Sequence, residues 1–123
     1  MFTILKCVST SVEVLENAWE LIKLLEVKKN LQGDINDDSI SFQLSCKSNP
    51  ADHFDEIVSN LNKCLTSIDG SFLPNKEETY LEIDTAIEPG DISGRNMLTW
   101  TMPNDLIYIL LKNSIRFTTT VYP

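Results

Sequence analysis

The clearest pattern along the chain is an alternation of apolar and polar side chains over residues 80–88. Its apolar positions are Leu81, Ile83 and Ile87. Its polar positions are Tyr80, Glu82, Asp84 and Glu88. A period of two is that of a β-strand with one buried face and one exposed face. We therefore expect a strand that packs on a core and holds a row of carboxylates on its outer side.

The same period, or a short apolar run, predicts four further strands, over residues 2–8, 39–46, 97–102 and 115–121. In the second of these the inward positions are Ile40, Phe42, Leu44 and Cys46. The first alternates poorly, so that either Phe2, Ile4 and Val8 or Thr3, Leu5 and Cys7 could face the core. The strand at residues 97–102 is expected to pair with the acidic strand as a meander.

Three segments show the three-to-four-residue spacing of helices, over residues 11–31, 50–68 and 103–112. Thr10 and Glu13 fit a capping box at the start of the first helix, and Asn49 with Pro50 fits the start of the second. The first helix is apolar over most of its circumference, which predicts that it is packed deeply or packed on two neighbours. Residues 33–38 are predicted to be a loop.

The resulting order, β-α-β-α-β-β-α-β, predicts a single α+β domain over residues 1–123. Because nearly every strand alternates, we expect two layers: a mainly antiparallel or mixed sheet of about five strands, with helices on one face and water on the other. The face in water is expected to show Ser39, Ser41, Gln43, Tyr80, Glu82, Asp84, Thr99, Thr101, Thr118 and Thr120.

Charge narrows the classes of partner. The chain has 18 acidic residues against 10 lysines and arginines, for a net charge of −8. Residues 69–91 alone hold seven acids and a single lysine, Lys76. Phosphate backbones and anionic membranes repel such a protein, so we expect no direct nucleic-acid or membrane binding and favour a basic protein partner. Many acidic proteins are acidic only for solubility, and that reading stays open.

The three cysteines are odd in number and far apart, which is typical of reduced thiols rather than of a disulfide framework. No apolar stretch is long enough to span a bilayer, and the N-terminus lacks the pattern of a secretion signal. These features predict a cytoplasmic protein.

No residue constellation identifies a reaction. The one histidine, His53, follows Cys46 by seven residues, but a buried strand-end cysteine and an exposed helix histidine explain both better than a catalytic dyad. Glu82 and Asp84 share a strand face at a spacing of about 7 Å, on a surface that offers no cleft. Residues 34–45 lack the glycine and the final glutamate of a calcium loop. We therefore expect no enzyme activity, no cofactor and no metal.

In size, charge and general design the chain resembles the bacterial immunity proteins that neutralise cognate nuclease toxins, including those of contact-dependent growth inhibition systems. The resemblance implies stoichiometric inhibition, in which carboxylates replace substrate phosphates in the toxin's positive cleft. The residues expected at the contact are Glu77, Glu78, Tyr80, Glu82, Asp84, Glu88 and Asp91, with Asp34, Asp37 and Asp38 as a second acidic edge. A monomer is expected before binding. The alternative is a ferredoxin-like ligand-binding or regulatory module that acts as a homodimer through its Ser/Thr-rich sheet face.

Overall fold

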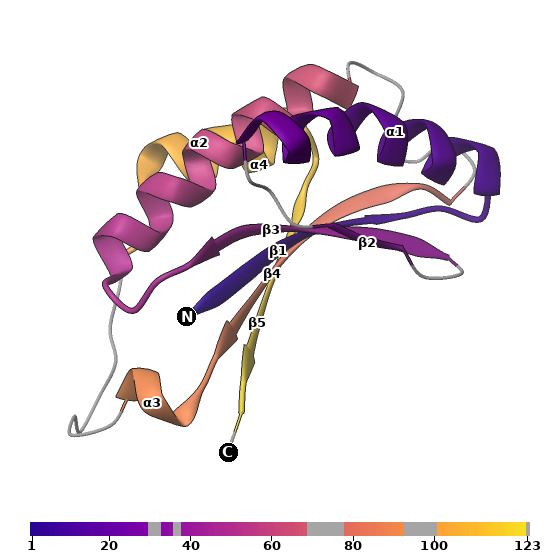
Figure 1. Cartoon of the computed structure of the whole chain (residues 1–123). Helices are drawn as coiled ribbons and strands as arrows, with labels where there is room; N and C mark the ends of the chain where they lie inside the picture. The colour runs from indigo at the N-terminus through magenta and orange to yellow at the C-terminus, as the bar shows by residue number, and fades with distance from the viewer. Residues whose placement is uncertain (30–32, 36–37, 69–77, 93–100, 123) are drawn as a thin grey trace.

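The computed structural model describes residues 1–29, 33–35, 38–68, 78–92 and 101–122 (Figure 1). The elements in chain order are β1 (Phe2–Val8), α1 (Val12–Lys29), β2 (Gly33–Ile35), β3 (Ser39–Cys46), α2 (Pro50–Ile68), β4 (Tyr80–Ile87), α3 (Pro89–Ile92), α4 (Asn104–Lys112) and β5 (Arg116–Val121). The helix predicted over residues 11–31 is thus described as far as Lys29.

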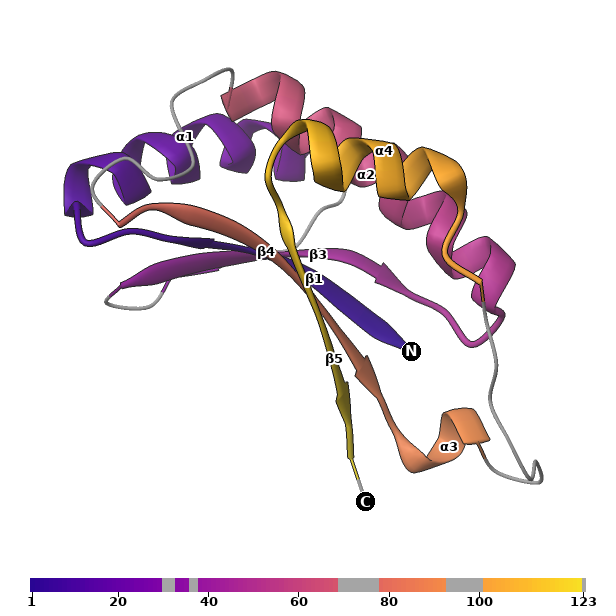
Figure 2. The same ribbon diagram turned by 180° about the vertical axis from the view of Figure 1, so that it is seen from behind.

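The strands form one sheet in the order β2-β3-β1-β4-β5. The central strand β1 is antiparallel to both β3 and β4, β2 is antiparallel to β3, and β5 is parallel to β4. Figures 1 and 2 show α1, α2 and α4 together on one face of this sheet, while no described helix covers the other face. The predicted α+β class, with a mixed sheet and helices on one side, is confirmed. We call the uncovered side the open face.

The core lies between the helices and the inner face of the sheet. Its strand residues include Leu5, Cys7, Ile40, Phe42, Leu44, Leu81 and Ile83. Its helix residues include Leu15, Ala18, Ile22, Phe54, Ile57, Leu61, Cys64, Leu106, Ile109 and Leu110. Trp19 of α1 stacks on Phe42 with 5.5 Å between the ring centroids, so this tryptophan packs on the core, as its helical position predicts. The alternation predicted for residues 80–88 is confirmed, because Leu81, Ile83 and Ile87 are buried.

The structure decides which side of β1 faces the core. Thr3, Leu5 and Cys7 are fully buried, whereas Phe2, Ile4 and Val8 are half-buried on the open face. Thr3 is tolerated inside because its Oγ1 lies 2.7 Å from His53 Nε2 and 2.9 Å from Thr85 Oγ1. A buried hydroxyl with hydrogen-bond partners avoids most of the cost of leaving water.

A bulge in β3 reverses the predicted exposure at its end. The β1–β3 register moves from Thr3–Ser45 to Ile4–Gln43, so Leu44 is an extra residue on β3. Such an insertion flips every later side chain to the other face. Ser45 is therefore buried and Cys46 is exposed, and the prediction that Cys46 faces the core is wrong. Asn60 of α2 donates a 2.7 Å hydrogen bond to the Leu44 carbonyl at the bulge.

The predicted element order is wrong in two places. A short strand, β2, lies where a loop was expected, and β4 does not form a meander with residues 97–102. Both edges of β4 are already bonded, one to β1 and the other to β5. The parallel β4–β5 pair needs a crossover connection, and α4 lies in it. Residues 97–100 lie outside the described residues, and Thr101 and Met102 belong to no strand.

Candidate functional site

A row of charged side chains crosses the open face of the sheet. In the strand register Glu82 on β4 lies between Lys6 on β1 and Arg116 on β5. Opposite charges on directly paired residues attract one another across neighbouring strands. Neither cation comes within ion-pair distance of Glu82 in the described structure; the Arg116 guanidinium stacks on the Tyr80 ring, 3.9 Å from its centroid. The charge of Glu82 is therefore partly balanced by this chain's own residues.

Apolar residues occupy the centre of the same face. Phe2, Ile4 and Val8 project there from the central strand, and Val8 is paired with Tyr80 on β4. The open face was expected to show polar residues, so the apolar residues of β1 are a departure from that prediction. Ser39, which was expected on this face, is buried. An apolar centre with a charged and polar rim is the usual anatomy of a protein–protein interface. Of the remaining predicted residues, Asp84 accepts a 3.4 Å hydrogen bond from the Thr120 hydroxyl.

Exposed acids from three segments lie at one end of the sheet. Asp38 precedes β3 and Glu78 precedes β4, and both strands run antiparallel to β1 on either side of it. Ser9, just after β1, donates its N–H to the Asp38 carbonyl at 3.1 Å, and its hydroxyl lies 2.8 Å from that of Thr79. Glu13 follows in the first turn of α1.

Glu13, Asp38 and Glu78 are all exposed, and together we call them the acidic end. It lies where β1 meets α1, at the right of Figure 1. Two strand spacings, about 10 Å, separate the strands that Asp38 and Glu78 precede. Sequence reasoning proposed Asp38 and Glu78 but missed Glu13. The sequence signal that could have identified Glu13 was its position five residues after Val8, the last residue of β1.

The structure does not describe the side chains of three other predicted contact residues. Asp37 and Glu77 lie outside the described residues. Asp34 belongs to β2, where it pairs with Ser41, but its side chain is not described.

Glu88 and Asp91 lie at the opposite end of β4, away from the acidic end. Glu88 is exposed. The Asp91 carboxylate binds the Met1 ammonium at 2.6 Å and accepts the Glu88 N–H at 2.9 Å. Burial would raise the pKa of Asp91, but these two hydrogen bonds and the charge of the ammonium outweigh it and hold the pKa below its usual value. The carboxylate of Asp91 is thus occupied within the chain.

Cys46 and His53 are placed opposite to expectation, because Cys46 is exposed and His53 is fully buried. His53 Nε2 lies 2.7 Å from Thr3 Oγ1, so the imidazole joins a buried hydrogen-bond chain that continues to Thr85. Burial, together with the nearby Met1 ammonium, lowers the pKa of His53 to about 4, although the Glu56 and Asp91 carboxylates oppose the shift. The ring is therefore neutral near pH 7 and is part of the buried interior.

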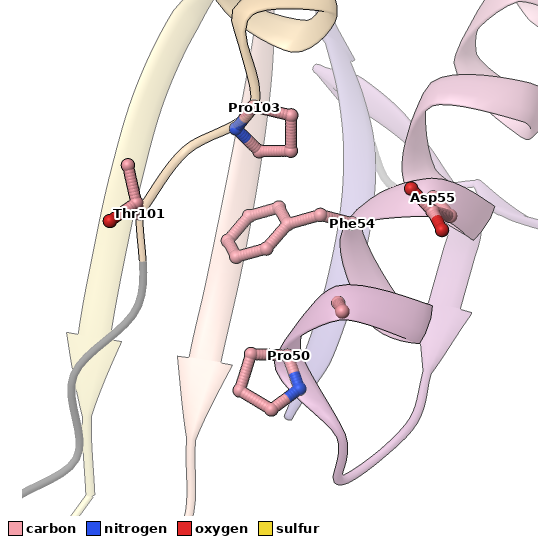
Figure 3. A pocket seen from close by; sticks show the side chains of 6 residues that line it. Pro50, Phe54, Asp55, Thr101 and Pro103 are labelled. Atoms are coloured by element: carbon pink, nitrogen blue, oxygen red, sulfur yellow. The ribbon is translucent and has the colours of Figure 1, made fainter.

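A hollow of about 310 Å³ lies between the first turn of α2 and the start of α4. Its lining residues are Pro50, Ala51, Phe54, Asp55, Thr101 and Pro103. Figure 3 shows the Phe54 ring projecting between the two prolines, so the wall is mostly apolar. Asp55 is its one ionisable lining residue among those described.

The described residues contain no group of three or more histidine, cysteine or acidic side chains placed to hold a metal ion. None of the helices in that part of the chain has the length and apolar character needed to cross a bilayer.

Comparison with known proteins found no matching family model, no matching curated protein and no matching solved structure.

Proposed function

We propose that this protein binds a basic protein partner and inhibits it by covering its cationic site, as the toxin-neutralising immunity proteins do. The observation that carries the proposal is the acidic end. Exposed carboxylates from segments far apart in the sequence meet at one end of the sheet, on a chain of net charge −8.

The physical basis is electrostatic. Fixed carboxylates on rigid elements create a negative potential that speeds encounter with a positive cleft and repels acidic competitors. Such steering weakens as salt rises, because the Debye length falls to about 8 Å at physiological ionic strength. Asp38 and Glu78 flank the last residues of β1, and Ser9 ties both segments to this strand. They are therefore held in place rather than carried on free tails.

The open face beside the acidic end supplies the apolar part of the proposed interface. Val8 and Tyr80 are paired near the end of β1 and adjoin Glu78. Tyrosine is a frequent anchor in interfaces because it combines a large ring with a polar tip. Glu82 contributes less charge than the sequence implies, because Lys6 and Arg116 flank it.

The other proposed residues fit this surface less well. Glu88 is at the far end of β4, and Asp91 is paired with Met1, so neither adjoins the acidic end. We therefore centre the proposed contact on Glu13, Asp38, Glu78, Tyr80 and Glu82.

A ferredoxin-like regulatory module that dimerises through its open face is the second candidate. The apolar residues Phe2, Ile4 and Val8 on the central strand favour it. In that case an Ile4→Lys variant would prevent self-association, and the acids would serve only solubility.

The direct test is to express the product of each adjacent reading frame alone and together with this protein. The proposal predicts that one of them is a basic protein that arrests growth, that co-expression restores growth, and that the two proteins form a one-to-one complex in isothermal titration calorimetry. Adjacent products that neither arrest growth nor bind this protein would contradict it.

A further inference from the structure

The outer edge of β5 has no strand partner in the described part of the chain. β5 is the last strand in the sheet order, and its inner edge is bonded to β4 over Arg116–Val121. A strand in this position presents a row of unpaired N–H and C=O groups to any extended chain that approaches. Figure 2 shows β5 running down from the end of α4.

The hydrogen-bond phase of β5 identifies which groups face outward. The Tyr122 N–H donates to the Ile87 carbonyl of β4 at 2.9 Å. Alternate residues of a strand direct their backbone groups to the same neighbour, so Thr118 and Thr120 share this phase. Phe117, Thr119 and Val121 have the opposite phase, so their N–H and C=O groups point away from the sheet.

Among the described residues, Arg116 is the one feature of this strand that would keep edge strands apart. Natural edges are protected by lysines, prolines, bulges or covering segments. The β4–β5 register runs without interruption from Glu82–Arg116 to Ile87–Val121, and the outward-facing residues are Phe117, Thr119 and Val121. Arg116 is the only charged residue of β5, so the acids that give the chain its net charge are not on this strand.

Two exposed apolar side chains lie on the β5 segment itself. In the described part of the chain the large exposed apolar residues are Val12, Leu24, Ile107, Tyr108, Leu111, Val121 and Tyr122. Val121 and Tyr122 are at the C-terminal end of β5, whereas Ile107, Tyr108 and Leu111 belong to α4, which precedes the start of the strand. Exposed apolar groups on an unpaired edge favour association with another apolar surface.

We propose that this protein forms a symmetric homodimer in which β5 pairs antiparallel with β5 of a second copy, about a twofold axis at Thr119. Every residue pair required by that symmetry is favourable. Phe117 faces Val121 of the second copy, and Thr119 faces its own counterpart. These are the three residues whose backbone groups point outward, so each pair can exchange two hydrogen bonds.

The remaining pairs lie on the open face of the sheet. Thr118 faces Thr120 of the second copy. Arg116, whose guanidinium stacks on Tyr80 of its own chain, faces Tyr122 of the second copy. Threonine pairs and guanidinium–ring contacts both stabilise neighbouring strands. Tyr122 is 52 % exposed, so its ring is available for the contact. Self-complementarity of this kind is what a twofold interface requires, and it favours a second copy over an unrelated strand.

The dimer goes beyond the proposed function. It does not use the acidic end: Asp38 precedes β3, on the other side of β1, and Glu78 lies four residues before Glu82, the first β4 residue that pairs with β5. It replaces the expectation of a monomer. A single pair of six-residue strands is a small interface, and small interfaces are typical of weak, transient association. The dimer is therefore concentration-dependent, and binding of the basic partner can be tested on it separately.

The test is sedimentation velocity on the full chain between about 10 μM and about 1 mM, where a weak dimer forms by mass action. Thr119→Pro removes an outward N–H and leaves the β4–β5 hydrogen bonds in place. Val121→Lys places a charge on the edge at a side chain that is 63 % exposed. Leu24→Lys is the matched control, because Leu24 is 62 % exposed and lies on α1.

We expect wild type and Leu24→Lys to shift from monomer to dimer over this range, while Thr119→Pro and Val121→Lys stay monomeric with unchanged circular dichroism. In amide hydrogen exchange, Phe117, Thr119 and Val121 should gain protection with concentration, whereas Thr118 and Thr120 should be protected throughout. A wild type that stays monomeric at about 1 mM would overturn the proposal. So would dimerisation that neither edge variant reduces, as an interface on the open face would give.

Discussion

The buried histidine gives the most quantitative prediction of the structure. His53 is the chain's one histidine, is fully buried, and has a pKa lowered from 6.5 to about 4 by burial and the nearby Met1 ammonium. In the unfolded chain the ring takes up a proton near pH 6.5, whereas in the folded protein it stays neutral until about pH 4. Folding stability is therefore lost as the pH falls through this window, because the unfolded state binds more protons.

The size of the effect follows from the two pKa values. One pKa unit corresponds to about 1.4 kcal/mol, so the full shift is worth about 3 kcal/mol, and most of it is lost between about pH 7.5 and about pH 4.5. Typical domains have a free energy of unfolding of about 5 to 15 kcal/mol, so the loss is a sizeable part of the total.

Urea denaturation at a series of pH values measures this loss, and His53→Gln is the reference protein. A glutamine amide keeps a polar group near the Thr3 hydroxyl but does not titrate. Carboxylates remote from His53 contribute equally to both proteins, so subtracting the two curves isolates the imidazole together with its interactions with Glu56 and Asp91. We expect wild type to lose about 2 to 3 kcal/mol more than His53→Gln over the window. Parallel curves would refute the assignment of a neutral, buried His53.

Two further predictions follow from buried groups. In the native protein only Cys46 should react rapidly with iodoacetamide, because burial raises the pKa of Cys7 and raises that of Cys64 to about 12. Mass spectrometry should find one adduct on the native protein and three adducts in denaturant. Rapid labelling of Cys64 in the native protein would contradict the packing. Asn60→Ala should lower the free energy of unfolding by about 1 kcal/mol, because the Leu44 carbonyl at the bulge loses its donor. Asn62→Ala, an exposed position on the same helix, is the control, and equal effects of the two changes would contradict this role.

Local pattern was sufficient to predict most of the longer elements but neither the short strand β2 nor the neighbours of each strand. The alternation around Ile83 and the spacing of Phe54, Ile57 and Leu61 predicted β4 and α2, because burial of one face is a property of each element alone. The partner of β4 could not be read this way, since alternation identifies an exposed face and not the strand that bonds to each edge. The bulge at Leu44 was equally invisible, because it depends on the pairing with β1.

For the candidate site, too, the sequence identified residues but not which of them lie close together. Asp38 and Glu78 stood out as acids in the sequence, but their approach depends on β3 and β4 both flanking β1, which is a property of strand order. The pairing of Lys6 and Arg116 with Glu82 depends on the same order. The acidic residues could thus be identified from the sequence, whereas the basic residues that lie beside them on the folded surface could not.

The most direct test of the account is the salt dependence of association with the basic partner, measured by stopped-flow fluorescence. The test variant is Asp38→Lys/Glu78→Lys, which reverses two charges of the acidic end. Glu88→Lys is the control, because Glu88 is an exposed acid at the opposite end of β4. The account predicts that the double variant lowers the association rate constant at least about tenfold at low salt and flattens its dependence on ionic strength, while Glu88→Lys changes it less than about twofold. Equal effects of the two variants, or none, would contradict the proposal that the acidic end meets the partner.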